Sequence, residues 1–456
     1  MIDWYSILFL AAGVIIFNLN RVAEHRSPLE FFMIGKKYGM KHATVLLWVS
    51  FFGTSSLFMP IYFLFHFGML ISIGYYMFSF ICMYLLLSYY LNGFQVKNIH
   101  EPILIRFYQK KFTKIGFSYF LPLFIFANLE GLLFQLSLAN NVFRVWFPQQ
   151  PFIFVALLLL FCVIFAGLGG MFTIYRTVYI LLLLCGFAFL FVPLFLFLKD
   201  GIHPIFESYL TFEKHHTLQL QEMIIIFIAI PIVFNGMLLT NSFQWQVLRS
   251  IKENYRNPSL KLSLFCSASI PASVLIYGIY IVSKHHPGTF LLFSKGLLQI
   301  PSRLIILMIV LVWLVSAAHS VAISIYSMAS IFLQSLHTKW QPSKKIRVMY
   351  LLIIVLTILV FVSQYWLVSY IKMIFIGYLL FYITISFPLL AICRGDKKYT
   401  YWLVICLFAF WMSGIFVYLV SHSLLLAVKV SIISSIFSMI GMYLYNISKI
   451  GNISQK

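Results

Sequence analysis

The chain has 456 residues, of which 62% are hydrophobic and only 9% are charged. A water-soluble domain has to cover its surface with polar groups. This composition therefore excludes a water-soluble domain and indicates a protein embedded in a membrane. The net charge of +21 is spread over short connectors between apolar runs. No connector is long enough to fold into a basic face, so a nucleic-acid partner is not expected.

About thirteen apolar runs have the length of roughly 20 residues that a helix needs to cross ~30 Å of hydrocarbon. The expected fold is therefore an all-α polytopic membrane protein. In chain order the predicted spans are Trp4–Leu19, Ala43–Phe67, Met69–Leu91, Ile115–Phe143, Phe152–Ile174, Val178–Leu198, Met223–Gln246, Leu262–Ser283, Leu304–Leu336, Val348–Val368, Met373–Ile392, Tyr401–Val420 and Leu424–Tyr445.

The basic residues predict the orientation of these spans. Of the 32 lysines and arginines, 24 fall in every second connector. Connectors rich in lysine and arginine stay in the cytoplasm. We therefore expect a cell-membrane protein with its N-terminus outside and its C-terminus in the cytoplasm.

Two predicted spans contain helix-breaking residues near mid-depth. The segment Gly53–Ser56 precedes Pro60, and five spans later Pro231 precedes the pair Asn235-Gly236. Broken helices at this spacing are typical of an inverted five-plus-five repeat that lines a cavity. The predicted repeats cover residues 43–198 and 221–392, with an extra span in 1–22 and two more in 400–446. Glycine and proline are also common in membrane helices in general, which leaves a packing explanation open.

Five short segments carry an ordered set of motifs: Glu30–Lys37, Ile99–Tyr108, Gly167–Thr177, Gln246–Glu253 and Ser316–Ser320. In that order they resemble the sodium:solute symporter family. The resemblance implies thirteen spans, an outside N-terminus and a leucine-transporter-like fold. The chain departs from the motifs at Val178, where the family has an acidic residue, and at Val247, where it has arginine.

The resemblance also implies a sodium site between two core helices, made by carbonyls at a helix break and by two hydroxyl groups. Here Ser316 supplies one hydroxyl, and Ala317 replaces the second. A site built from Ser316, Ser320 and the carbonyls of Phe51 to Thr54 is expected to bind sodium more weakly, so sodium coupling is left open.

Two ionisable residues inside predicted spans, Glu130 and His319, are candidates for proton coupling. Burying an acid in a bilayer is costly, which makes Glu130 a functional hypothesis; a hydrogen bond to a neighbouring helix is the alternative. His319 follows Ser316 by three residues and lies near the same helix face. An interhelical hydrogen bond is the favoured interpretation of His319, and a proton relay is the alternative.

Polar residues at or near the breaks are the candidates for contact with a small polar solute: Thr54, Ser55, Ser56, Asn235, Gln244 and Gln135. The six cysteines have no paired spacing, so neither a disulfide framework nor a zinc site is expected. The predicted cofactor requirement is limited to a coupling ion, Na⁺ or H⁺.

The leading hypothesis is secondary active transport of a small polar solute by alternating access, and no enzyme activity is expected. A flippase for a lipid-linked oligosaccharide is an alternative that would show an even number of spans and a basic central cavity. A membrane acyltransferase with His319 as base would need a second catalytic polar group. A degenerate symporter acting as a sensor is a further alternative.

Overall fold

A computed structural model describes Gly13 and residues 38–93, 103–167, 169–213, 220–285, 303–335, 341–394 and 398–451. The segment Glu30–Lys37, the start of the segment Ile99–Tyr108 and, apart from Gly13, the predicted span Trp4–Leu19 lie outside these residues. The regular structure of the described residues is helical, apart from isolated bridges at Tyr38–Ile251 and Phe112–Tyr399.

Nine described stretches are long and apolar enough to cross a membrane, and a bent helix pair makes a tenth. One of the nine, Ser343–Arg394, has 52 residues and is too long for one crossing at 1.5 Å per residue. It contains two helices joined by a short 3₁₀ turn. A further apolar helix, Pro151–Cys162, is shorter. The number of described helices is therefore roughly consistent with the predicted spans two to thirteen, but the predicted fifth span, Phe152–Ile174, runs into the next helix, which begins at Gly170.

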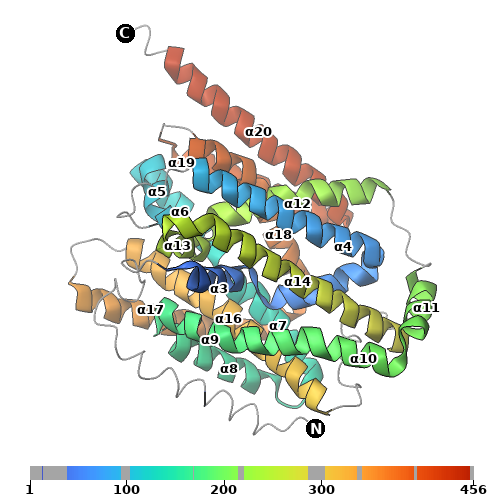
Figure 1. The fold of residues 1–456 in the computed structure, drawn as a ribbon. Helices are drawn as coiled ribbons and strands as arrows, with labels where there is room; N and C mark the ends of the chain where they lie inside the picture. Colours follow the sequence, from blue (N-terminus) through green and yellow to red (C-terminus); the bar gives the residue numbers. More distant parts are fainter. Residues whose placement is uncertain are drawn as a thin grey trace. The chain divides into compact units, whose positions relative to one another are not determined.

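The helices cluster into two compact units, and the first comprises the described residues within 1–80, 131–218 and 246–371. Within it, α16 contacts α7, α8, α9 and α17 (Figure 1). Its elements are α3 (Met40–Phe51), the first part of α4 (Thr54–Gly93), η1 (Gly131–Gln135), α7 (Leu136–Trp146), α8 (Pro151–Cys162), η2 (Val163–Gly167), α9 (Gly170–Gly186), η3 (Phe187–Phe191), α10 (Val192–Asp200), α11 (Ile202–Glu213), α14 (Glu253–His285), α16 (Arg303–Ser335), α17 (Pro342–Leu367) and η4 (Val368–Tyr370).

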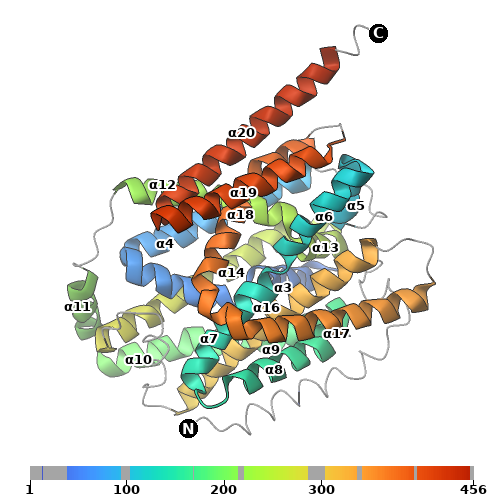
Figure 2. The same cartoon turned by 180° about the vertical axis from the view of Figure 1, so that it is seen from behind.

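The second unit comprises the described residues within 81–130, 219–245 and 372–456. Figure 2 shows α19 and α20 lying side by side in this unit. Its core contains Ile232, Leu380, Ile383 and Ala427. Its elements are the rest of α4, α5 (Ile103–Lys111), α6 (Lys114–Asn128), α12 (Leu220–Thr240), the start of α13 (Ser242–Ser250), α18 (Ile371–Arg394), α19 (Tyr401–Ser421) and α20 (Leu424–Gly451).

The first predicted break is confirmed. Helix α3 ends at Phe51, Phe52 has an extended backbone (φ −100°, ψ 120°), and α4 begins at Thr54. The helical axes on the two sides differ by 48°. A second interruption inside α4 falls at Gly68, whose φ of 76° is in the left-handed region that favours glycine. Gly68 separates the predicted spans two and three.

The second break is displaced from its predicted position. Helix α12 continues through Pro231 and the Asn235-Gly236 pair and ends at Thr240, and α13 begins after Asn241. Gly236 serves packing instead, because a Cβ atom there would meet the backbone of Tyr382 in α18. The prediction of a break at Asn235-Gly236 is therefore wrong, and the glycine allows two helices of the second unit to approach closely.

Side chains satisfy the backbone groups that this second break exposes. The carbonyls of Leu238, Leu239 and Thr240 accept hydrogen bonds from Trp245 Nε1 (2.7 Å), the Tyr108 hydroxyl (2.8 Å) and Asn128 Nδ2 (3.0 Å), respectively. Burial raises the pKa of Tyr108 well above its ordinary value, which keeps this phenol a donor.

The amide groups at the start of α13 are also bonded. Asn128 Oδ1 accepts from the Ser242 N–H at 3.2 Å, and Asn241 Oδ1 accepts from the Gln244 N–H at 3.0 Å. Asn128 therefore holds both sides of the break, and Asn241 acts as an N-cap.

Candidate solute and ion site

The first break is held by a hydroxyl from its own segment. The Gly53 N–H donates to Ser56 Oγ at 3.2 Å, and the Ser56 hydroxyl lies 3.4 Å from the Phe51 carbonyl oxygen. The Phe51 carbonyl, predicted as an ion ligand, therefore accepts a long hydrogen bond from Ser56. The side chains of Thr54 and Ser55 are outside the described part of the chain, so their predicted contacts stay predictions.

Two other predicted residues lie against this break. A Cβ atom on Gly53 would be 3.3 Å from Gln135 Oε1 and 3.3 Å from Ser320 Oγ. Gly53 thus lets an amide from η1 and a hydroxyl from α16 approach the broken backbone. The structure brings together Gly53, Gln135 and Ser320, which we call the break site.

The π-helical turn η1 is packed tightly against α16. A Cβ atom on Gly131 would meet the Ser324 side chain and the Ser320 carbonyl. The Leu132 carbonyl accepts from Gln364 Nε2 at 3.4 Å, and Gln364 Oε1 accepts from the Ser137 hydroxyl at 3.1 Å. A π-turn shifts the register of a helix and is frequent at functional sites.

Ser316 lies one helical turn before Ser320. The Ser320 hydroxyl donates to the Ser316 carbonyl at 2.8 Å. The Ser316 hydroxyl is fully buried, and it has no hydrogen-bond partner among the described residues. A buried hydroxyl without a partner is unfavourable, so Ser316 has the capacity to bind a group that the protein itself does not supply.

His319 is buried and links two helices. Its Nδ1 donates to the Val315 carbonyl at 2.8 Å, and its Nε2 lies 3.1 Å from the Thr177 hydroxyl in α9. This geometry agrees with the interhelical hydrogen bond that the sequence favours. The proton-relay role stays a prediction.

Glu130 belongs to the second unit and is half-buried between the end of α6 and the start of η1. Its Oε2 accepts a hydrogen bond from the Tyr382 hydroxyl at 2.9 Å. The same hydroxyl lies 3.2 Å from the Ala127 carbonyl. Tyr382 was not singled out by sequence, because its contact with Glu130 joins residues far apart in the chain.

The two remaining predicted solute contacts also belong to the second unit. Asn235 donates to the carbonyl of Ser386 at 3.1 Å and to its hydroxyl at 2.7 Å, and it accepts from the Tyr90 hydroxyl. Its amide thus has partners within the unit. Gln244 is buried, and its Oε1 has no partner among the described residues.

Asn140 is a buried polar residue that sequence analysis missed. It lies in α7, inside the predicted fourth span, and neither end of its carboxamide has a partner in the described part of the chain. The signal was a polar residue within an apolar run, the same signal that identified Glu130.

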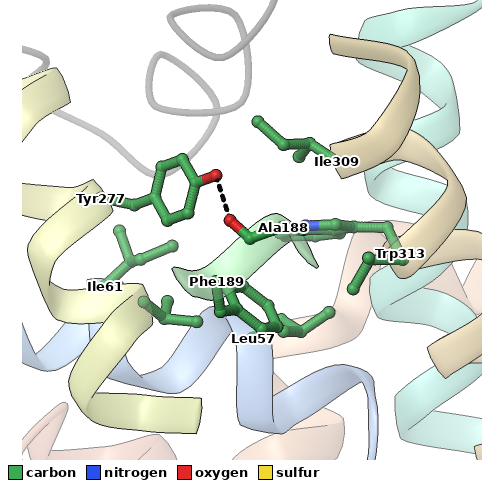
Figure 3. Close-up of a pocket in the computed structure, with 9 residues that line it drawn as sticks. Leu57, Ile61, Ala188, Phe189, Tyr277, Ile309 and Trp313 are labelled. Atoms are coloured by element: carbon green, nitrogen blue, oxygen red, sulfur yellow. Dashed lines mark hydrogen bonds between the residues drawn. The ribbon is translucent and has the colours of Figure 1, made fainter. Parts of the chain in front are cut away.

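An apolar pocket occupies another part of the first unit. Figure 3 shows the Tyr277 hydroxyl donating to the Ala188 carbonyl, at 2.7 Å, beside this pocket. Of the lining side chains only those of Tyr277 and Trp313 carry polar atoms, so the pocket offers little to a polar solute. The lining residues are Leu57, Ile61, Ala188, Phe189, Val274, Tyr277, Ile309, Val312 and Trp313.

The broken span, the π-turn against α16 and the many apolar helices are features of a helical membrane protein. Solved structures show which fold this is. A Na⁺-coupled sialic acid symporter has a similar structure, with a TM-score of 0.77 at 13% sequence identity over 97% of this chain and 98% of that one. A manganese transporter variant from Eremococcus coleocola is also similar, with a TM-score of 0.51 at 15% identity over 90% of this chain and 94% of that one.

The same manganese transporter in complex with an aromatic bis-isothiourea compound gives a TM-score of 0.51 at 15% identity, over 91% of this chain and 94% of that one. No family model and no curated protein sequence matches the chain. At these identities the likeness establishes the fold class, while the repeat boundaries 43–198 and 221–392 stay predictions.

Proposed function

We propose that this chain is a secondary active transporter that moves a small polar solute across a membrane by alternating access. The observation that carries the proposal is the break site, where Gln135 and Ser320 lie against broken backbone within otherwise apolar spans. Non-helical backbone is tolerated at membrane depth when it is buried in protein or lines a cavity. The symporter-like fold supports the same class.

The oxygen atoms near the break supply some, but not all, of the ligands expected for a hard cation such as Na⁺. Sodium prefers oxygen ligands, and the Ser316 and Ser320 hydroxyls with the carbonyls of Phe51 and Thr54 would supply them. Ser316 has a hydroxyl available, but Ala317 offers no second one beside it. No group of three or more His, Cys, Asp or Glu residues with metal-binding geometry is present in the described residues.

A proton is the alternative coupling ion. Glu130 with its Tyr382 partner, and His319 with Thr177, are the ionisable groups that support this alternative. An intramembrane carboxyl group that exchanges a proton during transport would become neutral in one state and charged in the other. We expect Glu130 to be the coupling residue if uptake follows a proton gradient.

Reconstitution into sealed vesicles tests the proposal. Uptake of a panel of small polar solutes would be measured under imposed sodium and proton gradients. Ser316→Ala is expected to abolish sodium dependence, and Glu130→Gln to abolish proton dependence. Ser267→Ala is a matched control for the serine variant, because this buried hydroxyl in α14 bonds the Ser263 carbonyl at 2.8 Å, outside the break site.

The outcomes separate the class from its details. Uptake of no solute under any gradient would refute the transporter assignment. Sodium-driven uptake that Ser316→Ala leaves unchanged would refute the sodium site alone. Uptake that requires neither gradient would point to a facilitator without ion coupling.

A further inference from the structure

Asn140 is the one fully buried asparagine in the described residues whose carboxamide has no hydrogen-bond partner at either end. A buried amide without partners is costly in a membrane interior, where no bulk water can replace them. Such a group persists when it bonds something that is bound to the protein for part of the time. Asn140 is therefore in a position to serve a ligand.

The packing around α7 locates Asn140 relative to the break site. Near one end, Gly131 of η1 packs against Ser320 and Ser324 of α16. Near the other, the rings of Trp146 and Trp313 lie 5.6 Å apart. The two helices therefore run antiparallel, and Asn140 lies between these two contacts along the chain.

Helix α8 closes another side of this region. Phe154 stacks on Phe147 at 3.9 Å between ring centroids, and the Cys162 thiol donates to the Ala318 carbonyl at 3.3 Å. The rings of Phe143, Phe147 and Phe154, together with the tryptophan pair Trp146 and Trp313, form an aromatic layer that begins one turn beyond Asn140 and reaches about two turns beyond it. Asn140 thus lies between this layer and the break site.

We propose that the Asn140 carboxamide is a contact for the transported solute and selects an uncharged group that carries a hydrogen-bond donor beside an acceptor. The amide offers one donating and one accepting end, which matches a pair of neighbouring hydroxyls or a carboxamide. This inference rests on the proposed transport function and names the class of solute for it.

The absence of charge around Asn140 supports an uncharged solute. Helix α8 contains no charged residue, and α7 contains only Arg144. Helix α16 contains Arg303, where it begins, and His319, whose ring nitrogens are bonded to Val315 and Thr177. The Arg144 guanidinium lies 5.6 Å from the Phe152 ring. A charged solute next to Asn140 would lose its hydration without gaining an opposite charge.

Cysteine modification at single positions in the full-length protein, reconstituted in vesicles, tests this inference. The variants are Asn140→Cys, Ala139→Cys as a buried control on another face of α7, and Gln135→Cys as a marker for the break site. The probes are methyl methanethiosulfonate and its anionic sulfonatoethyl and cationic trimethylammonioethyl analogues. Peptide mass spectrometry reports each position separately from the native cysteines.

We expect the uncharged reagent to modify Cys at position 140 faster than at position 139. Both charged reagents should react roughly 100-fold more slowly at position 140, a factor that corresponds to the cost of placing a charge at mid-membrane. Equal rates for all three reagents at position 140 would overturn the selection for uncharged groups. Equal rates at positions 139 and 140 would overturn the contact, because the reaction would then report loosened packing.

The Gln135→Cys marker separates the proposal that Asn140 contacts the solute from the proposal that the protein is a transporter. Modification at position 135 without modification at position 140 would show that Asn140 does not face the solute path, and it would leave the transport proposal intact. A permanently bound water molecule on the Asn140 carboxamide would give the same result. Modification at neither position would count against the aqueous cavity that alternating access requires.

Discussion

Buried asparagines in this protein occur in two opposite states. Asn235 has hydrogen bonds to Tyr90 and Ser386, whereas Asn140 has no partner in the described residues. Removing one member of a satisfied pair leaves the other unsatisfied, while replacing an unsatisfied group by an apolar one of similar shape can be neutral or stabilising. The two residues should therefore respond in opposite directions to the same substitution.

Asn235→Leu is expected to lower the free energy of unfolding by about 1–3 kcal/mol, because Tyr90 and Ser386 lose their partner. Asn140→Leu should leave stability unchanged or raise it while uptake falls. Thermal unfolding in detergent without added solute measures both variants. A loss of stability in Asn140→Leu as large as that in Asn235→Leu would show that Asn140 holds the fold together.

A single methyl group at the break site should impair transport without unfolding the protein. In Gly53→Ala the new Cβ would be 3.3 Å from oxygens of Gln135 and Ser320. We expect solute affinity to fall roughly tenfold, about 1.4 kcal/mol. Gly186→Ala is the control, since nothing lies within 4 Å of a Cβ there. Equal uptake by both variants would argue that the break site does not face the solute.

Among the elements, helix breaks and close helix approaches use the same residue types. Gly53 lies at a break, whereas Gly236 lies in a continuous helix against the backbone of Tyr382. The break in the second unit falls instead at Asn241, where Asn128 bonds both sides. The two kinds of glycine should differ in their tolerance of substitution.

Gly236→Ala is expected to destabilise the second unit, because its Cβ would force α12 and α18 apart. Gly377→Ala in α18 is the matched control, with nothing within 4 Å of the added Cβ. That control should be neutral or more stable by up to about 1 kcal/mol, since alanine favours helix over glycine. Comparable unfolding temperatures for the two variants would contradict the close approach at Gly236.

The local sequence correctly predicted a helix break at Gly53 and wrongly predicted one at Asn235-Gly236, and the difference has a physical reason. A break at Gly53 is made by neighbours in the chain, above all Ser56. The role of Gly236 depends on Tyr382, which is far away in sequence. The same limit applies to Asn140, which looks like Asn235 in sequence and differs only in its tertiary partners. Hydropathy predicted the spans because a helix in lipid satisfies its own backbone hydrogen bonds, so its apolar run can be recognised without knowledge of the neighbouring helices.

For the whole molecule, the charge pattern predicts an orientation that can be measured. Lys398 and Ser421 are exposed at opposite ends of α19, before and after one predicted span. With the N-terminus outside, Lys398 lies in the cytoplasm and Ser421 outside.

Cysteine placed at each of these two positions tests the orientation. In intact cells a membrane-impermeant thiol reagent should modify Ser421→Cys and leave Lys398→Cys unmodified until the membrane is opened. The reverse pattern would invert the proposed topology. Labelling of both positions in intact cells would show that α19 does not span the membrane.

The three π-turns of the first unit, η1, η2 and η3, also bear on how the length of this chain can vary. Each holds one residue more than an α-helix needs to cover the same rise. Deleting one residue from η1 would restore a regular helix and leave the later side chains of α7, Asn140 among them, on nearly the same faces. Residues 131–135, 163–167 and 187–191 are therefore places where relatives of this protein can lose a single residue, keep a continuous helix and still present the same side chains to its neighbours.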